Sequence, residues 1–253
     1  MNSITVAAIV FACAFGGALL GILLQRILPE SHLRHDSKEV IRLGTGLIAT
    51  MAALVLGLLV GTAKSSFDAQ TTGFQQLATN IILLDRTLAH YGPDAKQARD
   101  QLRIAVSSTI HRLWPGDDSH SGGLADATIT AGATELYDSI RSLSPQDNLQ
   151  RSLQARALQI GDDLARNRWQ LTQPDDNSLP IPFLVVLIFW LFVLFFSFGL
   201  FSPPNATVVT VLFVCALSVA GAVFLIVDLD QPFEGLLQVS SAALRSALAQ
   251  LGK

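Results

Sequence analysis

The fold is decided by an apolar stretch, LPIPFLVVLIFWLFVLFFSFGLF at residues 179–201, which is followed by SPPN at 202–205 and ATVVTVLFVCALSVAGAVFLIV at 206–227. Neither apolar run contains a charged residue. Each is long enough to cross a hydrocarbon core of about 30 Å, which takes roughly 20 helical residues. The prolines between the runs favour a tight turn, and Asn205 can cap the helix that follows. The two runs are therefore expected to be antiparallel transmembrane helices that lie side by side.

Two further uncharged apolar runs, at residues 4–24 and 43–63, are also long enough to span a membrane. Half of the 253 residues are hydrophobic and 15% are charged, against about 25% in an ordinary soluble domain. The run at 4–24 lacks the positive residues that precede a secretory signal, and it is longer than the apolar part of such a signal. We therefore interpret it as a retained helix, which gives four predicted spans.

Between the second and third spans the hydrophobic pattern becomes that of amphipathic helices. Apolar residues from Phe74 to Leu88 recur at three and four residues, and Tyr91-Gly92-Pro93 is expected to end this helix. A second helix is predicted to begin at Asp94, a short one to cover residues 133–143, and a longer one to run from Ser144 through Trp169. No strand is predicted.

The predicted fold is an all-α integral membrane protein with four transmembrane helices in two hairpins and an inserted helical bundle between the second and third spans. Residues 1–64 form the first hairpin, and residues 65–178 form the bundle, with a mobile loop near 115–132 that is rich in Gly, Asp and Ser. Residues 179–228 form the second hairpin. Residues 229–253 form an amphipathic helix that either lies on the bilayer or packs on the bundle; packing is favoured because the segment has few basic residues.

The charge pattern predicts an orientation in the membrane. The connection between the first two spans carries Arg26, Arg34, Lys38 and Arg42, which places that connection in the cytoplasm under the positive-inside rule. The helical bundle is then expected on the extracytoplasmic side. Lys64, directly after the second span, opposes this assignment.

Several function classes find no support in the sequence. The formal net charge is -3, and no basic run is interleaved with aromatic residues, so no nucleic-acid partner is expected. No set of nucleophile, base and metal ligands can be assembled, so we predict no catalytic residues, no metal, no cofactor and no enzymatic activity. His32 and His35 are interpreted as hydrated interfacial residues. Cys13 and Cys215 lie inside predicted spans and are interpreted as packing residues.

Small residues in the first two spans are the main candidates for function. Gly17 and Gly21 form one Gly-x-x-x-Gly pair, and Gly57 and Gly61 form another, a spacing that lets helix backbones approach closely. The second pair belongs to a longer stripe of small and partly polar residues that share one helical face and lead to an aspartate. Such a stripe suits either close packing or a water-lined pore, and both readings stay open. The stripe consists of Gly46, Thr50, Ala53, Gly57, Gly61, Ser65 and Asp68.

Acidic residues follow the fourth span. Asp228, Asp230 and Glu234 lie at the carboxyl end of a helix, where the helix dipole disfavours negative charge. They are either hydrated helix-end residues or candidates for a site with a cationic partner. If several subunits surround an axis, these carboxylates would form an acidic pore mouth that attracts cations.

Five short stretches resemble the bacterial bestrophin-like membrane proteins. They are AALVLGLLV at 52–60, AKSSFD at 63–68, LDRTLAHYGP at 84–93, SPPNAT at 202–207 and DLDQPF at 228–233. The resemblance implies kinship with bestrophins, which are oligomeric ion channels, commonly pentamers, with four spans per subunit and a second helix that lines the pore. The expected partners are then membrane lipid, inorganic ions and further copies of the chain.

This sequence departs from the bestrophin pattern in two respects. Bestrophin pore helices bring aromatic side chains to the narrow neck, whereas the second span here offers Leu, Val and Gly. Bestrophins also hold their helical bulk in the cytosol, against the charge pattern described above. An alternative hypothesis, favoured by the lack of charged residues within the spans, is a noncatalytic membrane sensor or scaffold whose helical domain binds a ligand or protein partner.

Overall fold

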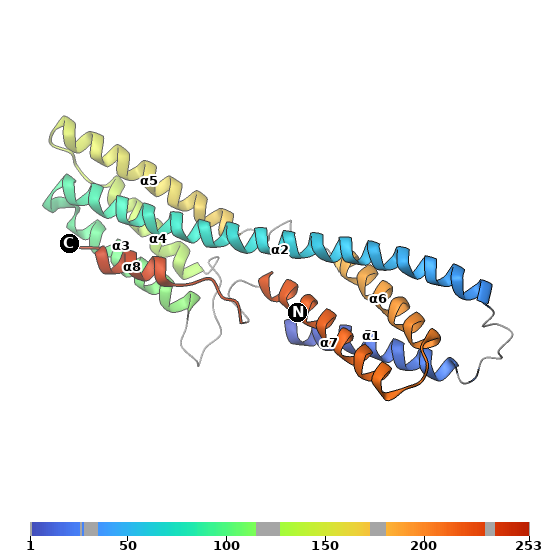
Figure 1. Ribbon diagram of the computed structural model, residues 1–253. Coiled ribbons are helices and arrows are strands. Elements are labelled where there is room, and N and C mark those ends of the chain that lie inside the picture. The colour runs from blue at the N-terminus through green and yellow to red at the C-terminus, as the bar shows by residue number, and fades with distance from the viewer. Residues whose placement is uncertain are drawn as a thin grey trace. The chain divides into compact units, whose positions relative to one another are not determined.

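The computed structural model describes residues 2–25, 27, 35–114, 127–172, 181–230 and 236–252, and every regular element within these ranges is a helix. The chain divides into two compact units. We call Met1–Phe67 with Asp176–Leu237 the apolar unit, and Asp68–Asp175 with Gln238–Lys253 the bundle unit. One unbroken helix, α2 (His35–Tyr91), contributes to both units (Figure 1).

The apolar unit contains α1 (Ser3–Gln25), the first part of α2, α6 (Ile181–Phe201) and α7 (Ala206–Leu229). Each of these four helices is long and apolar enough to cross a membrane. The four spans predicted from the sequence are therefore confirmed as apolar helices. The second span is the first part of a longer helix, because α2 continues far beyond the apolar run at 43–63 without a break.

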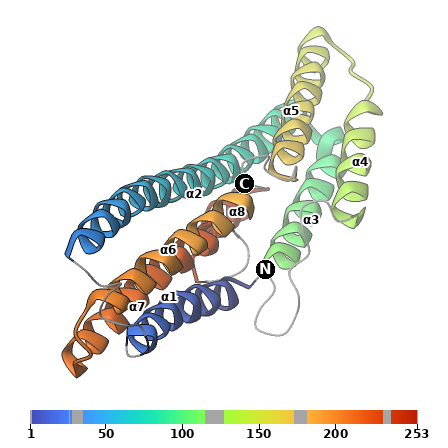
Figure 2. The same cartoon turned by 90° about the vertical axis from the view of Figure 1, so that its right-hand side faces the viewer.

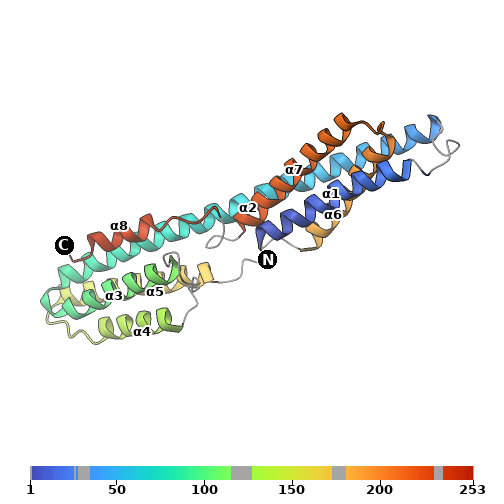
Figure 3. The ribbon, with the colours of Figure 1, turned by 90° about the horizontal axis from the view of Figure 1, so that it is seen from below.

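Helix α1 packs closely against both α6 and α7 (Figure 3). Gly21 has no room for a side chain, since a Cβ atom there would overlap the backbone at Phe196 and Leu200 of α6. A Cβ atom at Gly199 would likewise overlap the carbonyl of Ala18. These two glycines thus mark a close backbone contact between α1 and α6. Helices α6 and α7 share this packing on α1, and Phe195 of α6 lies in one core cluster with Leu212 and Ala216 of α7. The hairpin formed by the third and fourth spans stays a prediction.

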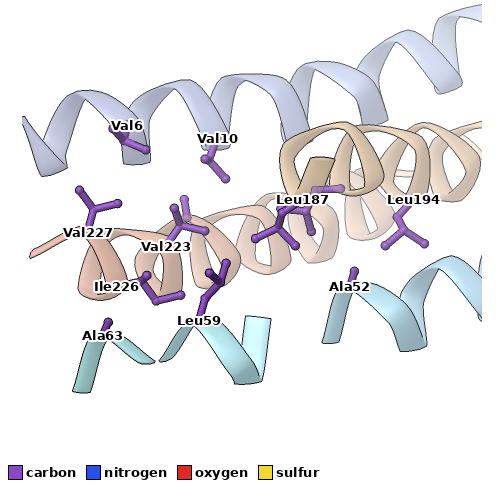
Figure 4. Packing of buried hydrophobic residues seen from close by; sticks show 12 residues of the cluster. Val6, Val10, Ala52, Leu59, Ala63, Leu187, Leu194, Val223, Ile226 and Val227 are labelled. Carbon is purple, nitrogen blue, oxygen red and sulfur yellow. The ribbon is translucent and has the colours of Figure 1, made fainter. Parts of the chain in front are cut away.

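A shared apolar core lies among the four helices of the apolar unit. Figure 4 shows Val6 and Val10 of α1 facing Val223 of α7, with Leu187 of α6 and Leu59 of α2 completing the cluster. These side chains are at most 5% exposed. Because neighbouring helices contribute branched residues to the same layer, burial of this face fixes which side of α2 points inward.

Among the described residues, the bundle unit contains the rest of α2 and five further helical segments (Figure 2). They are η2 (Pro93–Ala95), α3 (Lys96–Leu113), α4 (Ala127–Arg141), α5 (Asn148–Thr172) and α8 (Ala242–Gln250). Helix α2 ends at Tyr91 because Gly92 adopts a φ of 118°, which other residues rarely adopt.

The loop predicted near 115–132 is wrong for its last six residues, because α4 begins at Ala127. Helix α4 packs on α3 at Gly132, where an added Cβ atom would lie 3.9 Å from the Cβ atom of Ala105, which is an ordinary contact distance. The remainder of the predicted loop, 115–126, lies outside the described residues.

Two polar anchors hold the bundle unit together. Arg99 donates to both carboxylate oxygens of Asp85, from Nε at 2.7 Å and from Nη2 at 3.0 Å, and the backbone N–H of Gly252 donates to the same carboxylate at 3.2 Å. The hydrogen bond to Asp85 raises the pKa of the Arg99 guanidinium. Trp114 Nε1 donates to the carbonyl of Val239 at 2.9 Å. The segment that carries α8 is therefore attached to the bundle unit at both ends.

Candidate functional site

The small-residue stripe of α2 lies on the exposed face of the subunit. All seven of its members, from Gly46 to Asp68, are exposed in this single chain. A Cβ atom added at Gly46, Gly57 or Gly61 would meet no atom within 4 Å. Within the part of the chain that the structure describes, no helix therefore packs against these three glycines.

The opposite face of α2 is the one buried in the apolar core. Each buried residue follows a stripe residue by two positions: Ala52 follows Thr50, and Leu59 follows Gly57. Two positions correspond to a turn of about 200° around an α-helix. The subunit thus uses one side of α2 for its own core and leaves the other side, with its glycines and hydroxyls, uncovered.

The exposed surfaces of α6 and α7 are chemically different from the stripe. They present bulky apolar side chains of the kind that suits contact with lipid chains. Their large exposed apolar residues include Phe183, Val185, Phe189, Phe198, Val211, Phe213, Val214 and Leu217. Helix α2 also exposes leucines beside its stripe, namely Leu43, Leu47, Leu54 and Leu58.

The hydroxyl groups of the stripe region are oriented by the helix backbone. Thr50 Oγ1 donates to the carbonyl of Leu47 at 2.8 Å, and Thr62 Oγ1, beside the stripe, donates to the carbonyl of Leu58 at 3.0 Å. A hydroxyl that donates inward keeps its oxygen lone pairs available outward. The face can therefore offer acceptors to water or to a cation without carrying a formal charge.

The acidic residues after α7 do not form one exposed cluster. Asp228 is 0% exposed, and its carboxylate accepts hydrogen bonds from Ser3 Oγ at 3.2 Å and from the backbone N–H groups of Leu236 and Leu237 at 3.2 and 3.0 Å. A fully buried carboxylate cannot form part of a pore surface, so the pore-mouth interpretation of Asp228 is withdrawn. It joins the start of α1 to the segment after α7.

The other two acidic candidates differ from Asp228. Asp230 caps the carboxyl end of α7 and is half-buried. Glu234 lies outside the described residues. Within the described ranges, no group of three or more His, Cys, Asp or Glu residues could hold a metal ion.

Two contacts could not have been found by sequence patterns alone. Ser3 and Asp228 are separated by 225 positions, and no motif links a serine near the start of α1 to that aspartate. Gly199 was also missed, although a glycine among bulky residues is a signal of close helix approach. Its partner surface, the Gly17 and Gly21 pair, had been recognised as a candidate.

Comparison with known proteins identifies the family. A family model described as a Bestrophin-like domain matches residues 12–244. The chain belongs to the bestrophin-like family. The resemblance carried by the five short stretches is thereby confirmed, and membership agrees with the four apolar helices of a membrane protein. No curated protein matches the chain.

A solved structure shows the same bestrophin-like fold. The crystal structure of a bacterial bestrophin homologue from Klebsiella pneumoniae, which carries a tyrosine-to-alanine substitution, matches with a TM-score of 0.65. The two chains are 17% identical, and the match covers 93% of this chain and 96% of that chain. At this identity the likeness establishes the fold, while the function has to be argued from the site.

Proposed function

We propose that this bestrophin-like protein is the subunit of an oligomeric ion channel of the bacterial inner membrane. The exposed face of α2 lines the pore, and the helices of the bundle unit form a vestibule. Family membership supports a channel, and the bestrophin resemblance supports a homo-oligomer, with five subunits as the starting expectation. Its partners are membrane lipid, inorganic ions and further copies of the same chain.

One observation carries this proposal: the stripe from Gly46 to Ser65 is small, partly polar and uncovered within the subunit. In lipid, glycines and hydroxyls are enriched where helices meet or where water enters. A lipid-facing surface would instead resemble the exposed faces of α6 and α7. The stripe therefore faces neighbouring subunits or a water-filled axis.

The proposed pore has a modest preference for cations. Asp68 lies three positions beyond Ser65 on the same face of α2 and is exposed. Repeated around an axis, such carboxylates attract cations and repel anions. Asp230 and Glu234 remain proposed contributors, whereas the buried Asp228 is excluded. Bestrophin kinship makes an anion channel the rival to this selectivity.

The test combines oligomeric state with conductance. The molar mass of the purified protein in detergent is measured by light scattering, and single-channel currents are then recorded from a planar bilayer. Gly57→Leu should abolish assembly or conductance, because the added side chain enters the uncovered face. Gly221→Leu on α7 is the matched control, since Gly221 also has open space around it but lies on a different helix. A strict monomer without conductance would remove the channel proposal. Normal assembly and normal currents from Gly57→Leu would instead show that the stripe of α2 neither lines the pore nor packs between subunits.

A noncatalytic sensor or scaffold is the second candidate function. The observation that favours it is a cavity in the bundle unit, large enough for a small molecule. A sensor would show ligand binding by this unit in a chain that never conducts. The extracytoplasmic location of the bundle remains our proposal for either function, supported by the arginines and lysine between the first two spans.

A further inference from the structure

The bundle unit contains a partly open cavity of about 370 Å³ that the proposed pore does not use. Small-molecule sites usually occupy about 300–1,000 Å³, and a cavity of about 150 Å³ already binds benzene. The volume here leaves room for about 15 non-hydrogen atoms. Its walls are mainly apolar and come from five helices, with Leu77, Leu84, Leu102, Val106, Ile140 and Leu244 among the lining residues.

Helices α2 and α5 meet on either side of this cavity. A Cβ atom at Gly73 would lie 2.8 Å from the side chain of Leu171, which marks one close contact between the two helices. At the other end, Gln150 Nε2 donates to the carbonyl of Tyr91 at 3.1 Å. The helices are thus held together at both ends, and the cavity lies between these two contacts.

The cavity changes in polarity along its length. Because α5 runs antiparallel to α2, the end of α5 that carries Arg168 lies level with Leu77, at the Gly73 end. Because only Gly92 and η2 separate α2 from α3, and Arg99 pairs with Asp85, α3 also runs antiparallel to α2, which places Thr109 near the same end. The opposite end is lined by apolar residues. Arg168 is half-buried, whereas the carboxylate that also borders the cavity, Asp162, is exposed to water.

We propose that this cavity binds a small apolar carboxylic acid, whose hydrocarbon body lies between α2, α3 and α4 and whose carboxylate pairs with Arg168. Water in such a cavity finds few polar partners, and displacing poorly held water by an apolar group favours binding. An arginine matches a carboxylate in charge and in geometry. Tyr137 forms part of the wall beside Gly161, where an added Cβ atom would lie 3.4 Å from the tyrosine ring.

The test uses naphthaleneacetate as the probe and the full chain in phosphatidylcholine nanodiscs, measured by calorimetry against empty discs. Wild type should bind saturably with a dissociation constant between about 10 µM and 1 mM, as expected for a ligand of this size. Naphthaleneacetamide has the same shape without the charge and should bind about tenfold more weakly.

Two pairs of variants locate the probe. Arg168→Gln should weaken binding of the acid about tenfold and abolish its advantage over the amide, whereas Arg166→Gln, on the exposed side of α5, should leave both unchanged. Ala105→Phe should fill the cavity and prevent binding, whereas Ile104→Phe, next to it but 69% exposed, should not. Elution volume and thermal stability check that each variant folds.

Three results would overturn this inference: no saturable heat above that of empty discs, full binding by a folded Ala105→Phe variant, or an undiminished preference for the acid in Arg168→Gln. The channel proposal does not depend on any of them, because it rests on the exposed face of α2. Binding with the predicted variant pattern would support the site whether or not the protein conducts.

Discussion

Replacing Asp228 should destabilise the protein and leave ion selectivity unchanged. In the structure its carboxylate accepts hydrogen bonds from three donors, Ser3 Oγ and the N–H groups of Leu236 and Leu237. A hydrogen bond to a charged group contributes about 1.5–3 kcal/mol. The expected cost is below the simple sum of three such bonds, because Leu236 and Leu237 are exposed and their N–H groups can bond to water in the variant.

Ser3 behaves differently, since it is only 5% exposed and its hydroxyl would lose the Asp228 carboxylate as acceptor without gaining water. We therefore expect Asp228→Ala to lower the free energy of unfolding by about 3 kcal/mol. For a chain of this size that corresponds to a fall in melting temperature of about 6–12 °C. Asp228→Asn keeps one acceptor oxygen and should lose about half as much.

The assay is thermal unfolding of the purified protein in detergent, followed by far-ultraviolet circular dichroism at one fixed scan rate. Asp138→Asn is the control, because Asp138 is exposed on α4. The free energy of unfolding of this variant should lie within about 0.5 kcal/mol of the wild-type value. Bilayer recordings in a salt gradient then report selectivity. Unchanged melting of Asp228→Ala together with a shifted reversal potential would refute the reasoning and return Asp228 to the permeation path.

Three further changes test other parts of the structure. Arg99→Met should cost about 3–5 kcal/mol in thermal unfolding because it leaves a buried carboxylate without its cation, while Arg103→Met on the exposed side of α3 should cost less than about 0.5 kcal/mol. Gly21→Leu should prevent α1 from packing on α6 and yield no folded protein on gel filtration, whereas Gly16→Leu, which has open space, should fold normally. A Ser152→Cys variant without the native cysteines should react with an impermeant maleimide in intact spheroplasts, and labelling only after lysis would reverse the proposed orientation.

The membrane helices were predictable because lipid imposes a simple rule on sequence. A spanning helix needs about 20 apolar residues in succession, and the predicted runs at 4–24, 179–201 and 206–227 end within two residues of α1, α6 and α7. The end of α2 at Tyr91 was equally predictable, since Gly92 adopts a backbone conformation that glycine tolerates best.

The roles of individual residues were less predictable, because patterns that look alike in sequence occupy different surroundings. Gly17 and Gly21 have the same spacing as Gly57 and Gly61, yet the first pair contacts α6 and the second has open space. Which glycine pair contacts a neighbouring helix depends on how the four helices pack together, and the spacing within one helix contains no such information. Asp228 is a similar case, because its burial depends on Ser3 at the far end of the sequence.

The contrast between the two glycine pairs bears on how subunits assemble. Association of helices in lipid depends on close packing, since lipid chains are as apolar as the helices themselves. The glycine contact between α1 and α6 holds the subunit together, so the open face of α2 is available for contacts between subunits.

A ring of identical subunits uses heterologous contacts, in which one face of a subunit meets a different face of the next. Helix α2 offers two neighbouring exposed surfaces for this purpose, the small-residue stripe and the leucines that include Leu54 and Leu58. In a ring, one surface turns toward the axis and the other toward the adjacent subunit, so the substitution that blocks conductance without dissociating the ring identifies the surface that lines the pore.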